Sequence, residues 1–139
     1  MDAFIRKTVI AIIFFMAFAG TVQAEEMEDK SITVNIYYTG TNGNARKFAD
    51  EMETSGIASL IRQKNGNLRY DYFYPRDDKE TVLLIDSWKN QAELDAHHAS
   101  DLMPKIMELR NKYDLHMRVE RYISDENGLP AADKKFIRK

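Results

Sequence analysis

The chain has 139 residues, a length that suits a single domain with short extensions. It carries 20 Lys and Arg against 22 Asp and Glu, and this balance argues against a nucleic-acid binder, which would show a basic excess. It contains no cysteine, which excludes disulfides, thiolate nucleophiles and cysteine-based metal sites.

The first 24 residues are typical of a secretory signal peptide. A basic start precedes the apolar run 9–19, and the small residues Val22 and Ala24 stand before the expected cleavage point. This run is shorter than the roughly 20 residues that cross a bilayer, so we expect no stable membrane anchor after cleavage. Cleavage near Ala24 predicts a secreted or periplasmic protein that begins with a flexible leader at 25–30.

The rest of the chain alternates between strand and helix patterns. A β-branched and aromatic segment predicts a strand at 31–39, and apolar residues at helical spacing predict a helix at 45–63 with a kink near Gly56. Asn90 followed by Glu93 is typical of a helix start. The remaining predicted segments are hairpin strands at 68–74 and 81–88, helices at 91–98 and 102–113, a strand at 116–123 and a loosely held tail at 124–139.

The order β-α-β-β-α-β predicts an α+β domain at 31–123 with the ferredoxin-like split βαβ arrangement. This is a four-stranded antiparallel sheet with its helices on one face. We expect the other face to carry apolar and aromatic side chains that no helix covers. Such a face is rarely left in water, so we expect a homodimer packed sheet against sheet. The residues expected on that face are Val34, Ile36, Tyr70 and Tyr72.

Three short motifs lie within this domain. They comprise Gly66, Leu68, Arg69, Tyr70 and Asp71, then Asp86 and Trp88, then Leu94, His97 and Ser100. Their order and spacing resemble those of the antibiotic biosynthesis monooxygenase (ABM) domain family, over about residues 31–123. The resemblance implies a dimeric α/β barrel with a pocket between sheet and helices in each subunit. Some members of this family oxygenate quinols or polyketide aromatics without metal or flavin, others degrade haem, and others isomerise small carbonyl compounds.

Two departures from the family pattern bear on function. Many members carry a second His or an aromatic residue just after the serine, whereas this chain has Asp-Leu-Met-Pro at 101–104. The haem-degrading members resemble this chain at Asn35. However, their pocket Trp aligns with His97 and their iron-binding His aligns with Met107, so haem degradation is disfavoured.

The resemblance points to a monooxygenase that uses O₂ on a quinol-like or small aromatic substrate, with no cofactor and no metal. His97 is the candidate base, because an imidazole with an ordinary pKa of roughly 6.5 suits proton transfer near neutrality. Asn35 would orient the substrate oxygen. The expected substrate-binding residues are aromatic or carry a thioether: Trp88, Tyr72, Tyr37, Met103 and Met107.

Structural explanations compete with these roles. His97 and His98 are neighbours in a helix, so only one of them is expected to face a pocket, and Trp88 at a strand end could be a core residue. Adjacent histidines lack the i, i+4 spacing that chelates zinc on a helix. The alternative functions are a non-catalytic small-molecule-binding barrel and an isomerase of small carbonyl metabolites.

Overall fold

The computed structural model describes residues 30–125 and 129–138, so the predicted signal peptide and most of the predicted leader lie outside the described residues. The centre of the domain is a four-stranded antiparallel sheet with the order β2-β3-β1-β4. Within the described ranges, no helix is long and apolar enough to cross a membrane. The strands are β1 (Ile32–Thr39), β2 (Asn67–Phe73), β3 (Thr81–Trp88) and β4 (His116–Ile123).

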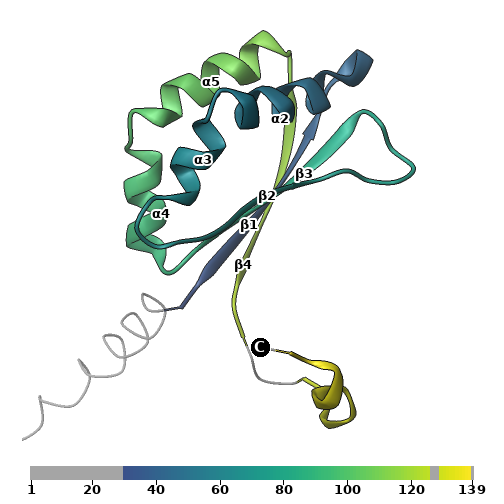
Figure 1. Cartoon of the computed structure of the whole chain (residues 1–139), viewed down its shortest axis with the longest axis vertical. Coiled ribbons are helices and arrows are strands. Elements are labelled where there is room, and N and C mark those ends of the chain that lie inside the picture. Colours follow the sequence, from purple (N-terminus) through teal and green to yellow (C-terminus); the bar gives the residue numbers. More distant parts are fainter. Residues whose placement is uncertain (1–29, 126–128, 139) are drawn as a thin grey trace, which may run out of the picture.

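The α-helices all lie on the same side of this sheet (Figure 1). The predicted helix at 45–63 is two helices, because Gly56 takes a left-handed conformation with φ of 81° that only glycine adopts without strain. This break is the kink that the sequence predicts. The helices are α2 (Asn44–Thr54), α3 (Ile57–Arg62), α4 (Gln91–His98) and α5 (Leu102–Lys112), with the 3₁₀ turns η1 (Thr41–Gly43) and η2 (Ala131–Phe136).

The strand pairing confirms the predicted ferredoxin-like arrangement. β1 is central and pairs antiparallel with both β3 and β4, so that Ile36 lies between Leu84 and Val119. β2 pairs with the far edge of β3. The two halves of the chain therefore each contribute one central and one edge strand, and the last residue of β3 leads directly into α4.

The prediction for the uncovered face of the sheet is wrong. Val34, Ile36 and Tyr72 pack against the hydrophobic core on the helix side, and Tyr70 is only 2% exposed there. In β1 these side chains share a face with Ile32, because successive side chains of a strand alternate between faces. The open face instead carries Thr33, Asn35 and Tyr37 of β1 with Leu83, Ile85 and Ser87 of β3.

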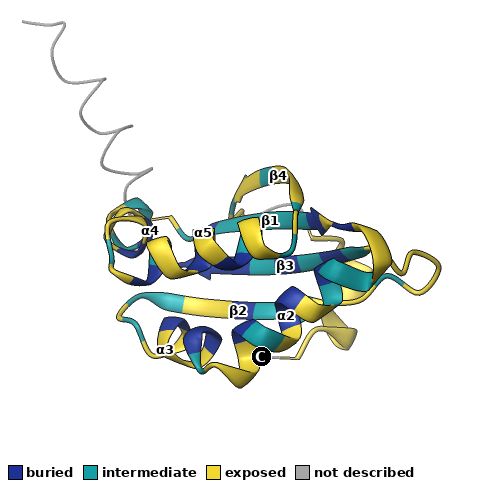
Figure 2. Ribbon diagram, turned by 90° about the horizontal axis from the view of Figure 1, so that it is seen from above, coloured by how far each residue is buried: buried dark blue, intermediate teal, exposed yellow. Residues whose placement is uncertain are grey.

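The core fills the layer between the sheet and the helices. Figure 2 shows buried residues along β3 and on the inward sides of the helices, whereas β4 is largely exposed. Trp88 and Tyr38 are the largest of the fully buried side chains, and the Tyr38 ring lies 4.9 Å from the ring of Phe48 between centroids. This layer also holds two buried ionisable side chains, Asp86 and His97.

Candidate active site

A stacked pair of rings joins the end of β3 to α4. Asn90 caps α4 by accepting a hydrogen bond from the backbone N–H of Glu93 at 3.0 Å, as the sequence predicts. This cap starts the helix two residues after Trp88, so that His97 lies over the indole. The two rings are nearly parallel, at 19°, with centroids 4.9 Å apart. His98 is exposed, so His97 is the histidine that faces the core.

His97 is a buried imidazole. It is 4% exposed, and its Nδ1 has no hydrogen-bond partner among the described residues. Burial lowers the pKa of His97 to about 4, and the neighbouring His98 and the nearby positive charges of Lys64 and Arg110 act in the same direction. The ring is therefore neutral near pH 7.

Asp86 is the second buried ionisable group on this side of the sheet. It lies two residues before Trp88, on the same face of β3, and is 4% exposed. Its Oδ1 has no hydrogen-bond partner in the part of the chain that the structure describes. Burial raises the pKa of Asp86 from an ordinary 3.8 to about 7, and the indole N–H of Trp88 opposes this rise only in part.

Three tyrosines and an arginine complete the buried polar layer. Tyr70 pairs with Asp86 across β2 and β3, and its ring lies 5.8 Å from that of Tyr72 between centroids. Arg110 of α5 donates a hydrogen bond from Nη2 to the Tyr38 hydroxyl at 2.7 Å. Burial raises the pKa of Tyr38, Tyr70 and Tyr72, so all three remain protonated and can donate hydrogen bonds near neutral pH.

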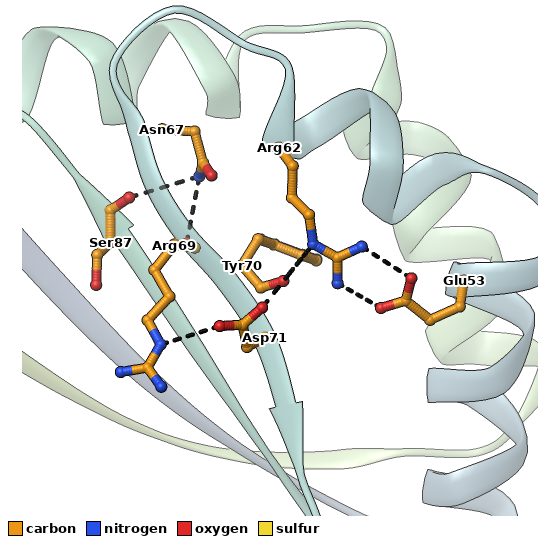
Figure 3. Close-up of polar contacts among 7 residues, drawn as sticks. All are labelled: Glu53, Arg62, Asn67, Arg69, Tyr70, Asp71 and Ser87. Atoms are coloured by element: carbon orange, nitrogen blue, oxygen red, sulfur yellow. Dashed lines mark hydrogen bonds and ion pairs between the residues drawn. The ribbon is translucent and has the colours of Figure 1, made fainter.

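An arginine of α3 holds the edge strand that carries Tyr70 and Tyr72. Figure 3 shows Arg62 between β2 and α2, where its Nε donates to the backbone carbonyl of Tyr70 at 2.8 Å and its Nη1 donates to Glu53 at 2.8 Å. The ion pair is half-exposed and so contributes little on its own. The bond to the strand carbonyl fixes where the tyrosines lie relative to α3.

A shallow hollow of about 180 Å³ opens beside the stacked rings of Trp88 and His97. It is smaller than the roughly 300–1,000 Å³ of typical small-molecule sites, so we expect rim side chains to move when an aromatic ring enters. The other residues that line the hollow are Lys64, Asn65, Glu93 and Ala96.

Glycine is required at one corner of this rim. Gly66 has a φ of 76°, and a Cβ there would lie 2.4 Å from Cγ of Glu93. The side chain of Asn65 donates to Glu93 at 2.9 Å, which ties the turn before β2 to the first turn of α4. The first residue of the family-like motif is thus a packing requirement of the rim.

The structure brings together only some of the residues that the sequence singles out. Trp88, His97 and Tyr72 share the helix side of the sheet. Asn35 and Tyr37 lie on the open face, where the Tyr37 hydroxyl donates to Glu120 at 3.3 Å. On α5, Met103 packs against the core, whereas Met107 is 55% exposed.

Sequence reasoning did not single out Asp86 as a chemical group, although a signal was present. In β3 the inward positions Val82, Leu84 and Trp88 are all large and apolar, so Asp86 is the exception in an otherwise apolar row. For Arg110 no comparable signal exists, because arginine is common on exposed helix surfaces. Within 30–125 and 129–138, no group of three or more His, Asp or Glu side chains could hold a metal ion.

Comparison with known proteins gives one family and a set of similar folds. The sequence model of the family described as antibiotic biosynthesis monooxygenase matches residues 31–109. SnoaB of Streptomyces nogalater, a cofactor-independent oxygenase, is 13% identical, with a TM-score of 0.60 over 73% of this chain and 98% of its own.

Two further solved structures share the fold. PA3566 of Pseudomonas aeruginosa is 18% identical, with a TM-score of 0.60 over 70% of this chain and 96% of its own. SO0527 of Shewanella oneidensis is 20% identical, with a TM-score of 0.57 over 69% of this chain and 92% of its own. No protein with a curated description matches the sequence significantly.

Proposed function

The chain belongs to the antibiotic biosynthesis monooxygenase family, and from that premise we propose that it is a cofactor-independent monooxygenase acting on a quinol-like or other small aromatic compound. The observation that carries this proposal is the buried Trp88–His97 stack beside the Asp86 carboxyl, with polar atoms that have no partner among the described residues. Because residues 1–24 are typical of a signal peptide, we also propose that it acts after export, in the periplasm or outside the cell.

The proposed reaction requires few catalytic groups from the protein. An electron-rich aromatic hydroxyl loses its proton to a base, and the resulting anion transfers an electron to O₂. Recombination forms a carbon–oxygen bond, and the second oxygen atom leaves as water, so that a quinol and O₂ give a hydroxyquinone and water. The protein supplies the base, donors that stabilise the anion, and a site from which water is excluded.

The helix side of the sheet offers hydrogen-bonding groups and apolar surroundings for this reaction. Trp88 and His97 both line the hollow, where an aromatic ring that enters can contact their stacked rings. The neutral ring of His97 can hydrogen-bond a substrate oxygen, since its Nδ1 has no other partner in the described structure. The protonated hydroxyls of Tyr70 and Tyr72, which lie together, are further donors. The surrounding core side chains are apolar. The name of the similar Streptomyces nogalater protein, a cofactor-independent oxygenase, supports the same chemistry.

Oxygen uptake tests the proposal directly. With a panel of benzoquinols and naphthoquinols, we expect uptake above the rate of autoxidation. His97→Ala is expected to lower the rate at least tenfold, because it removes the ring packed on Trp88, while exposed His98→Ala changes it little. An oxygen electrode measures the rate, and circular dichroism confirms that both variants fold. A wild-type protein that consumes no oxygen with any quinol would favour a binding protein or an isomerase instead.

We further propose that a second copy of this chain covers the open face of the sheet. Leu83 and Ile85 of β3 are half-buried on this face, and Phe73 and Tyr122, on the two edge strands, are 39% and 51% exposed. A stable interface of about 1,600 Å² would cover this face. Light scattering at low micromolar concentration should give twice the mass of one chain.

A substitution on each side of the sheet sharpens the dimer test. Ile85→Lys places a charge in the open face and is expected to give monomers. Leu60→Lys, at a 51% exposed position on α3, is the matched control and should leave the mass unchanged. A wild-type monomer at these concentrations would disprove the packing.

A further inference from the structure

Asp86 is buried without the counter-ion that usually accompanies a buried carboxylate, and the indole N–H of Trp88 offsets only part of the effect of burial. It takes part in no ion pair among the described residues, whose ion pairs lie at exposed or half-exposed positions. A buried carboxylate without a counter-ion opposes folding, and an asparagine of the same shape would not carry that charge. The fold therefore gains nothing from the charge, and a chemical use of the group is the better explanation.

The position of Asp86 fits such a use. It lies near the end of β3 on the sheet's helix side, with Tyr70 opposite on the neighbouring strand and Trp88 two residues on in its own. The His97 ring stacks on Trp88, and the Tyr72 hydroxyl on β2 lies beside that of Tyr70, which interacts with it. The hollow beside the stack is lined by Trp88 and His97 but not by Asp86 or Tyr72, so a phenolic ring that enters there must displace core side chains to bring its hydroxyl to the Asp86 carboxylate.

We propose that Asp86, and not His97, is the base that takes the proton from the substrate hydroxyl. This rests on the proposed function. In this step the substrate O–H bond breaks, an O–H bond forms on the Asp86 carboxylate, and the electron pair stays on the substrate oxygen as a phenolate. No oxidant is consumed until O₂ reacts with that anion. In this assignment His97 lines the site and supplies a neutral hydrogen-bonding group.

The acid strengths of the two groups agree with this assignment. A base works best when its pKa lies near the working pH, and burial places the pKa of Asp86 at about 7. The pKa of His97 is lowered to about 4, so its ring is a poor proton acceptor. Tyr38 of β1 and Tyr70 of β2 are the ionisable groups whose pKa values respond to the charge of Asp86. On the same side of the sheet α4 contributes His97 and α5 contributes Arg110, while the core side chains from α2 and α3 are the apolar Phe48, Met52 and Ile61.

The pH dependence of kcat/KM for quinol oxidation distinguishes the two candidates. If Asp86 is the base, wild-type activity falls below a midpoint near pH 7. His97→Gln keeps that midpoint, and Asp86→Asn lowers the rate by about 10²-fold or more. Exposed Asp95→Asn is the matched control and should behave as wild type. A midpoint near pH 4 that His97→Gln abolishes, with Asp86→Asn within threefold of wild type, would overturn the assignment.

Phenol binding separates the role of Asp86 from oxygenation, because phenol donates a hydrogen bond without needing to react with O₂. By calorimetry, the wild-type dissociation constant for phenol should rise at least threefold from pH 8 to pH 5, while that of Asp86→Asn stays constant. If phenol binding behaves in this way but no quinol causes oxygen uptake, the monooxygenase proposal is rejected, while Asp86 stands as the group that accepts the hydrogen bond of phenol. Suppose instead that the wild-type protein takes up oxygen and that Asp86→Asn changes neither the rate of uptake nor phenol binding. The monooxygenase proposal would then stand, and Asp86 would be rejected as the base.

Discussion

Trp88→Ala is expected to lower the free energy of unfolding by about 3–5 kcal/mol, the usual cost of truncating a large buried aromatic side chain. The indole is fully buried and ends β3, and its loss would leave a cavity between the sheet and α4. The same change removes the surface on which His97 stacks. Quinol oxidation should therefore be lost even at temperatures where the variant is folded.

Urea denaturation at fixed protein concentration measures this effect. Trp88→Phe keeps an aromatic ring at the site and is expected to cost much less. Leu60→Ala, at a 51% exposed position, should change stability by no more than about 0.5 kcal/mol. If the free energy of unfolding of Trp88→Ala lies within about 1 kcal/mol of the wild-type value, Trp88 does not join the sheet to α4 as described.

The pH dependence of stability should reveal two opposing titrations in the same layer. The folded state raises the pKa of Asp86 from 3.8 to about 7, so it binds more protons than the unfolded state over that range. The stability that this carboxyl contributes is present below about pH 4 and is lost as the pH rises to about 7. Because a tenfold change in a proton-binding constant corresponds to roughly 1.4 kcal/mol, the loss is on the order of 4 kcal/mol.

His97 has the opposite effect. Its folded-state pKa of about 4 lies below its ordinary value of 6.5, so the folded state binds fewer protons than the unfolded state in between. Stability is lost as the pH falls from 6.5 towards 4. The change is on the order of 2 kcal/mol, allowing for solvent screening at the rim. Over this range the two contributions oppose each other in the wild-type protein.

Single variants should unmask each titration. Asp86→Asn leaves only His97, so its stability relative to wild type should fall on acidification from pH 6.5 to 4.5. His97→Gln leaves only Asp86, so its relative stability should rise over the same interval. Urea denaturation at several pH values measures both differences. The contributions of the other carboxylates to the pH dependence are the same in each protein and cancel when variants are compared. Parallel pH curves for all three proteins would mean that neither group has a shifted pKa.

The sequence predicted the fold better than the site, and β1 shows why. Alternation separates Val34 and Ile36 from Asn35 and Tyr37, but both sets contain large side chains that could face a core. Only the pairing of β1 with β3, which aligns Val34 with Asp86, decides which set meets the helices. The wrong choice of face placed Asn35 in the expected site.

Local signals were more reliable where one residue determines the geometry. The Asn90 cap and the break at Gly56 depend on nearest neighbours, so both could be predicted. Which of His97 and His98 faces the sheet depends on the rotation of α4 about its own axis. That rotation is set by the packing of Leu94 and His97 against β3. The spacing of apolar residues in a helix of eight residues is too short a pattern to predict it.

The Trp88–His97 stack has a spectroscopic consequence. The chain contains one tryptophan, so its entire indole fluorescence comes from the ring beside the proposed site. A buried indole emits at short wavelength, and a protonated imidazole in contact with it quenches that emission. The protein thus carries an intrinsic optical reporter of its own pocket, which responds to the arrival of an aromatic ligand and to the charge on His97 without any attached dye.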